Sequence, residues 1–112
     1  MEIYDLYGFK LNEIEKALEA VESALGIEMQ VSENLSRGIY YRKRLSYEGE
    51  HFILKRNIDF TDREFEKNLS LADPKFPDYP ILLYVNNTKR SEELKKVLTE
   101  FAGFTLLCHQ VL

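Results

Sequence analysis

The residue types that most often carry out catalysis are scarce in this sequence. The 112-residue chain has one cysteine, Cys108, and two histidines, His51 and His109. A zinc site needs several such ligands at short, regular spacing, and the two histidines lie far apart. Cys108 and His109 are neighbours, but on a strand their side chains would point to opposite faces, which argues against a nucleophile–base pair. We therefore predict no metal site, histidines at the surface or rim, and Cys108 as a small apolar residue of a C-terminal strand.

No glycine-rich loop that could bind phosphate is present. The five glycines stand singly along the chain, so the P-loop and dinucleotide-binding patterns are absent. Carboxylates are numerous, but carboxylates on a helix face or in a proline-containing loop are usually solvated. A glycosidase-like acid/base pair stays open, although a domain of this size offers little cleft to raise the pKa of a carboxyl group. We expect a protein that is not an enzyme and needs no cofactor.

Acidic side chains gather in two places that could contact a partner. One is residues 59–80, which also hold all three prolines, and the other is the outer face of the first helix. A long irregular segment in a small domain often has a function, and aromatic residues beside charges make good interface anchors. We predict that these residues bind a basic partner: Asp59, Asp62, Glu64, Glu66, Asp73, Asp78, Tyr79, Glu19 and Glu22. The alternatives are that the charges serve solubility and that the aromatic residues pack the segment onto the sheet.

A second candidate surface combines arginines with tyrosines. If residues 39–58 form a hairpin, one sheet face would carry Tyr40, Arg42, Arg44, Ile53 and Lys55. RNA-binding ferredoxin-like domains stack bases on aromatic residues of such a face. The acidic balance of the chain opposes this reading, and such strands more often form cross-strand packing pairs. An RNA- or ligand-binding module is therefore the alternative function, and we do not expect nucleic acid as the partner.

The apolar pattern predicts the elements that would position these residues. Strands are expected at 2–9, 27–31, 81–85 and 104–108, and a hairpin at 39–47 and 51–58 with its turn at 48–50. The first helix should bury a stripe from Leu11 to Leu25, with Asn12 at its start and Gly26 at its end. The second should begin at Ser91 and bury Leu94, Val97, Leu98 and Phe101. One helical turn is possible at 62–68.

The order of these elements predicts one α+β domain over residues 1–112. Residues 3–29 and 81–106 each follow the order strand, helix, glycine, strand, and they flank the central hairpin. Two such split halves indicate a ferredoxin-like or related single sheet of about five to six strands, with two helices packed on one face.

The overall composition is that of a globular protein that stays in the cytoplasm. Apolar residues make up 45% and charged residues 30%, the net charge is −4 and the pI is about 5.2. The first residues lack the pattern of a signal peptide, and no apolar run is long enough to cross a membrane. An acidic protein repels phosphate backbones, so the net charge favours a cationic protein partner or a partner without charge.

Several local patterns together resemble immunity proteins of bacterial contact-dependent growth-inhibition systems. They are Tyr7-Gly8-Phe9 before a helix, Leu25-Gly26-Ile27, Gly38-x-Tyr40-Tyr41, and residues 76–85 (Phe-Pro-Asp-Tyr-Pro-Ile-Leu-Leu-Tyr-Val). The resemblance implies a cytoplasmic bacterial protein that neutralises one cognate toxin domain. We expect the chain itself to be a monomer or a weak homodimer. Such toxins are often nucleases, and the immunity protein covers the active site or substrate surface. Contacts vary with the toxin, so the resemblance assigns no binding residue here.

Overall fold

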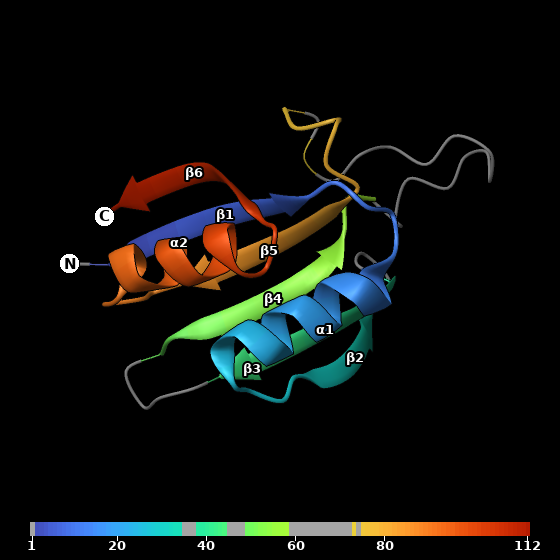
Figure 1. The fold of residues 1–112 in the computed structure, drawn as a ribbon, viewed down its shortest axis with the longest axis horizontal. Coiled ribbons are helices and arrows are strands. Elements are labelled where there is room, and N and C mark those ends of the chain that lie inside the picture. Colours follow the sequence, from blue (N-terminus) through green and yellow to red (C-terminus); the bar gives the residue numbers. More distant parts are fainter. Residues whose placement is uncertain (1, 35–37, 45–48, 59–72, 74) are drawn as a thin grey trace.

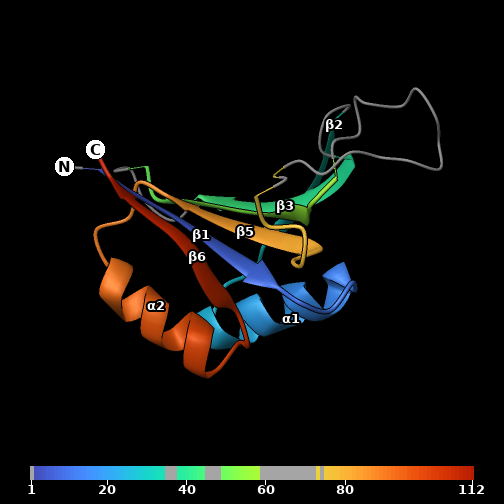
Figure 2. The same ribbon diagram turned by 90° about the horizontal axis from the view of Figure 1, so that it is seen from above.

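The computed structural model describes residues 2–34, 38–44, 49–58, 73 and 75–112. In chain order the elements are β1 (Ile3–Phe9), α1 (Ile14–Leu25), β2 (Gln30–Asn34), β3 (Gly38–Arg44), β4 (His51–Arg56), β5 (Ile81–Asn86), α2 (Ser91–Glu100) and β6 (Thr105–Val111). The strands form one antiparallel sheet in the order β2-β3-β4-β5-β1-β6. Both helices lie on the same face of this sheet (Figures 1 and 2). The predicted α+β class, the single sheet and the two helices on one face are confirmed.

The two arms of the expected central hairpin pair with each other, whereas residues 45–48, which include the start of the turn predicted at 48–50, lie outside the described residues. Strands β3 and β4 pair antiparallel from Tyr41 opposite Leu54 to Arg44 opposite His51. The strand after α1 begins later than predicted, at Gln30 instead of residue 27. The reason is local, because the Met29 N–H donates to Glu22 Oε2 at 2.8 Å and Met29 is buried in the core. Residues 27–29 are thereby tied to the end of α1.

The core fills the space between the sheet and the helices. Tyr7, Phe52, Leu54, Ile81, Leu83 and Val85 contribute from the strands, and Ile14, Ala17, Val21, Leu94 and Leu98 from the helices. Strand β5 lies inside the sheet between β4 and β1, as its near-continuous apolar run predicted. Burying one such aliphatic side chain stabilises the fold by about 1.5–3 kcal/mol.

Helix ends differ in part from the prediction. The residue preceding α1 is Glu13 and not Asn12, whereas Gly26 does end the helix at φ 65°, with its N–H donating to the Glu22 carbonyl. Ser91 is the first residue of α2 but caps no backbone group. Phe101 was expected in the buried stripe and is 73% exposed, because α2 ends at Glu100. Leu11, also expected in a stripe, precedes α1 and is exposed.

Candidate functional site

A buried asparagine organises the chain beyond β4. Asn57 is 1% exposed, and its Nδ2 donates to the carbonyls of Asp73, Phe76 and Tyr79 at 3.3, 3.1 and 3.1 Å. Its Oδ1 accepts the Asp73 N–H at 2.7 Å, and its own N–H donates to the Pro80 carbonyl at 2.8 Å. Asp73 and residues 75–80, called the 73–80 segment below, are therefore held against the end of β4 by one side chain.

The same segment packs closely on strand β1. A Cβ added at Gly8 would overlap the Tyr79 ring, lying 2.6 Å from its Cγ, and would be 2.8 Å from Leu107 Cδ1. The Lys10 ammonium lies 5.8 Å from the centre of the Tyr79 ring. Glycine at position 8 is required by this approach and not by its backbone angle. Tyr79 thus packs the segment onto the sheet, as one of the sequence-based alternatives expected of the aromatic residues of 59–80, while the aromatic residues at positions 60 and 65 lie outside the described residues.

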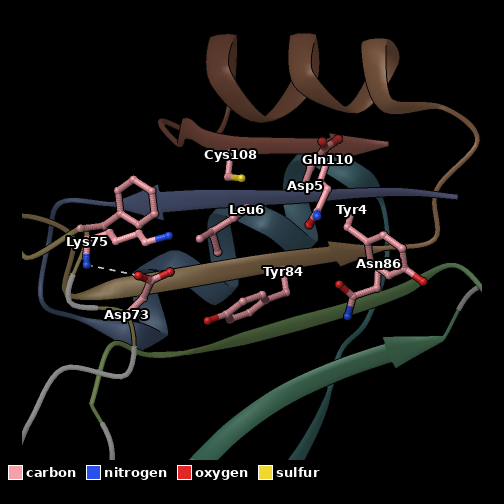
Figure 3. A pocket seen from close by; sticks show the side chains of 10 residues that line it. Tyr4, Asp5, Leu6, Asp73, Lys75, Tyr84, Asn86, Cys108 and Gln110 are labelled. Carbon is pink, nitrogen blue, oxygen red and sulfur yellow. Dashed lines mark hydrogen bonds between the residues drawn. The ribbon is translucent and has the colours of Figure 1, made fainter. Parts of the chain in front are cut away.

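Next to the segment lies a half-open cavity of about 280 Å³ on the sheet face away from the helices (Figure 3). Its lining from the strands is Tyr4, Asp5, Leu6, Tyr84, Asn86, Cys108 and Gln110, and from the segment Asp73, Lys75 and Phe76. The cavity combines apolar and aromatic walls with a few polar groups, the composition typical of a binding site. Cys108 does lie on a C-terminal strand, but it is exposed and borders this cavity instead of packing as an apolar residue.

The predicted acidic surface is divided by the sheet. Asp73, Asp78 and Tyr79 lie in the 73–80 segment, on the cavity side, and the Asp78 side chain is exposed. Glu19 is exposed on α1, which covers the opposite face. Asp59, Asp62, Glu64, Glu66 and the possible helical turn at 62–68 lie outside the described residues. The described acidic residues therefore belong to two faces of the molecule.

Glu22 has a role inside the chain. Its Oε2 accepts the Met29 N–H, and its backbone carbonyl accepts the N–H groups of Gly26 and Ile27. The side chain is half-buried, and its bond to Met29 ties residues 27–29 to the end of α1. Elsewhere on this helix Glu13 forms an exposed ion pair with Lys16 at 3.2 Å.

The arginine–tyrosine face has the predicted register but not the predicted accessibility. Arg42 pairs with Ile53 across β3 and β4, so the five expected residues share the face away from the helices. Only Arg42 and Arg44 are exposed, whereas Tyr40, Ile53 and Lys55 are 6%, 7% and 8% exposed. The Lys55 ammonium lies 5.6 Å from the centre of the Tyr84 ring. Tyr40 does not present a ring face on which a base could stack.

Asp5, Ser91 and His109 meet at the start of α2. Ser91 Oγ donates to Asp5 Oδ2 at 2.6 Å, and His109 Nδ1 lies 2.6 Å from Asp5 Oδ1. In a serine–histidine–aspartate triad the serine bonds the imidazole nitrogen that the carboxylate does not bind. Here Ser91 and Asp5 approach the same nitrogen, with Ser91 at 3.4 Å, and the serine proton goes to the carboxylate. The cluster fixes α2 against β1 and β6 and does not activate a nucleophile.

Sequence reasoning did not identify Asp5. Its side chain is fully buried, although it sits in an otherwise apolar and aromatic strand. The signal in the sequence was an acidic residue within an apolar and aromatic strand, because a buried carboxylate requires hydrogen-bonding partners. The histidine placement agrees with the prediction of a rim residue, since the His109 side chain is 43% exposed at the edge strand β6.

A second polar network joins the start of β4 to the β5–α2 connection. Glu50 accepts hydrogen bonds from Thr88 Oγ1 at 2.7 Å and from Arg90 Nη2 at 2.8 Å. Burial alone would raise the pKa of Glu50, but the hydrogen bonds from Arg90 and Thr88 outweigh it, so the pKa is lowered. The same bond to Glu50 raises the pKa of Arg90. This pair is part of the framework and lies outside the cavity lining.

Among the described residues, no three His, Cys, Asp or Glu side chains are grouped in a way that could hold a metal ion. Neither helix in this part of the chain is long and apolar enough to span a bilayer. The buried Tyr7 hydroxyl has no hydrogen-bond partner among the described residues, and burial, followed by Asp5 and Glu92, raises the pKa of Tyr7.

Comparison with known proteins found no counterpart: no family model matches the chain, and no curated protein sequence matches it.

Proposed function

We propose that this chain is an immunity-type protein that binds a cognate toxin domain in the cytoplasm and neutralises it without a chemical step. The observation that supports this best is the attachment of the 73–80 segment by Asn57. A segment held in one conformation loses little entropy on binding, so it is suited to recognising a partner. Its exposed Asp78 and the net charge of −4 favour a basic partner such as a nuclease.

We also propose that the sheet is a ferredoxin-like sheet extended by two strands. Strands β4-β5-β1-β6 are neighbours in that order, and α1 and α2 lie on one face, which agrees with the ferredoxin-like arrangement. Strands β2 and β3 would then be an addition at the β4 edge. In such sheets the face away from the helices is commonly a binding face, and here it carries the cavity.

The alternative of an RNA-binding module is supported less well. A base platform needs exposed aromatic rings beside basic groups. Tyr40 is buried and only Arg42 and Arg44 of that face are exposed. We therefore place the docking surface at the 73–80 segment and not at the β3–β4 hairpin.

The test is co-expression with the toxin domain encoded beside the gene of this chain. The proposal expects a complex that co-purifies and restores growth to cells producing the toxin. Asn57→Ala should weaken the complex while the purified variant stays folded by circular dichroism. Failure of the wild-type chain to bind or protect would refute the proposal, as would turnover of a substrate by the chain alone.

A further inference from the structure

We propose that the cavity beside the 73–80 segment binds the guanidinium group of an arginine side chain presented by the partner. The inference rests on the proposed function, because it names the partner group that this face would recognise. Its test below uses no toxin, so it can fail or succeed independently.

The size of the cavity favours a single side chain. Sites for drug-sized ligands usually measure about 300–1,000 Å³, and this cavity, at about 280 Å³, lies just below that range. It is half-open, as an interface pocket must be to admit a group from another protein (Figure 3). Arginine is among the residues most enriched where a partner inserts an anchor into such a pocket.

The walls suit a flat cation. Tyr4 and Tyr84 come from the neighbouring strands β1 and β5, and Phe76 comes from the segment. Guanidinium groups stack on aromatic rings. This face of the molecule already packs cations in that way, since Lys55 lies over the Tyr84 ring and Lys10 over the Tyr79 ring.

A fixed carboxylate supplies the counter-charge. Asp73 is held by two hydrogen bonds from its backbone to Asn57, and its Oδ1 accepts the Lys75 N–H at 3.2 Å. Among the described residues Oδ2 accepts no hydrogen bond that competes with a guanidinium donor. Asn86 and Gln110 provide amide oxygens at the opposite side of the cavity (Figure 3).

Two charged side chains of opposite sign border the cavity and can reach a ligand there. They are the carboxylate of Asp73 and the ammonium of Lys75, whereas the Asp5 side chain is fully buried. Asp5 is already bonded to Ser91 and His109, so Asp73 is the acceptor within reach of a ligand. Lys75 opposes an incoming cation, but its side chain is exposed and can turn toward solvent. Removing that ammonium should therefore strengthen binding.

The experiment is a titration of the ¹⁵N-labelled chain with N-acetyl-arginine amide, followed by amide chemical shifts. The expected result is saturable shifts at Leu6, Tyr84 and Gln110. Asp73→Asn should weaken binding about threefold to fivefold, the size expected for one partly exposed ion pair, and Lys75→Met should strengthen it about twofold. Asp73→Asn keeps the oxygen that accepts the Lys75 N–H, so the fold should persist. Glu28→Gln, which removes an exposed carboxylate away from the cavity, should have no effect.

Three results would overturn the proposal. The first is equal response to N-acetyl-lysine amide or N-acetyl-tyrosine amide, which would remove the specificity for a guanidinium group. The second is shifts centred on a different cavity, of about 330 Å³, whose lining includes Ile14, Glu15 and Arg56. The third is an unchanged affinity in Asp73→Asn. None of these results bears on toxin binding itself, which is tested separately by co-purification.

Discussion

Asn57 and Asp73 exchange two hydrogen bonds: Asn57 Nδ2 donates to the Asp73 carbonyl at 3.3 Å, and the Asp73 N–H donates to Asn57 Oδ1 at 2.7 Å. One amide side chain therefore replaces the backbone partners that an irregular segment would otherwise lack. Because Asp73 also borders the cavity, the same bonds determine where its carboxylate lies. The stability of the 73–80 segment and the shape of the cavity are therefore coupled at this pair.

Asn57→Ala should therefore cost about 2–4 kcal/mol of the free energy of unfolding, since several buried polar groups lose their partner at once. Urea denaturation measures the loss. Gln30→Ala, which changes an exposed side chain of edge strand β2, is the control and should change stability by less than about 0.5 kcal/mol. A loss no greater for Asn57→Ala than for the control would show that the segment is held by other contacts.

The approach of Tyr79 to Gly8 gives a second prediction. Gly8→Ala should destabilise the fold by about 1–3 kcal/mol, because the methyl group would overlap the Tyr79 ring and approach Leu107. In Gly8→Ala/Tyr79→Ala the two losses should not add, since removing the ring makes room for the methyl group. Additive losses in this double-mutant cycle would contradict the contact.

Gly26→Ala is the matched comparison for Gly8→Ala, because glycine is favoured at position 26 by its backbone angle and not by a close contact. No atom lies within 4 Å of a Cβ built at position 26, but φ is 65°. A loss of about 1 kcal/mol is expected from the left-handed backbone alone. Tyr79→Ala should leave that loss unchanged.

Glu50 should make stability depend on pH. Its folded-state pKa lies below the ordinary value of 4.5, so folding favours the charged form. The contribution is complete above the unfolded pKa and is lost as the pH falls through the lowered folded pKa. Urea unfolding between pH 7 and pH 3 should show less acid destabilisation in Glu50→Gln than in wild type. If the free energy of unfolding fell equally with decreasing pH in both proteins, Glu50 would not contribute to the acid destabilisation.

Arg90→Ala tests the other half of this pair. It should cost about 1–2 kcal/mol at pH 7, less than for a fully buried pair because the Arg90 side chain is 40% exposed and screened by solvent. Lys16→Ala, which removes the exposed ion pair with Glu13, should cost at most about 0.5 kcal/mol. Equal losses of stability in Arg90→Ala and Lys16→Ala would indicate that the burial of Glu50 does not strengthen its ion pair with Arg90.

The sequence allowed the elements to be predicted because their signals are local. The alternation in β3 and β4 and the apolar run of β5 depend on residues only a few positions apart. The polar networks depend on distant residues: the Asn57 side chain bonds residues up to 22 positions away, and Asp5 bonds His109 across 104 positions. No periodicity encodes such pairs. The division of the acidic residues between two faces likewise follows from strand order, which the sequence pattern leaves open.

That division leads to the last prediction, which concerns the toxin complex. Asp78 lies with the 73–80 segment on the cavity side, and Glu19 lies on α1 on the other side of the sheet. A compact toxin domain that docks on the cavity side should respond to Asp78→Lys and not to Glu19→Lys. Stopped-flow association at low salt should be slower for Asp78→Lys by about threefold to tenfold, and the difference should shrink as added salt screens the charges.

The combined reversal of Asp62, Glu64 and Glu66 should add to this effect if residues 59–72 belong to the same docking surface. The reverse pattern, slow association for Glu19→Lys and wild-type association for Asp78→Lys, would move the docking surface to α1. In that case the cavity and Asp73 would have no part in toxin binding, because the sheet separates them from α1. The rate of a single variant on each face thus decides which side of the sheet meets the toxin.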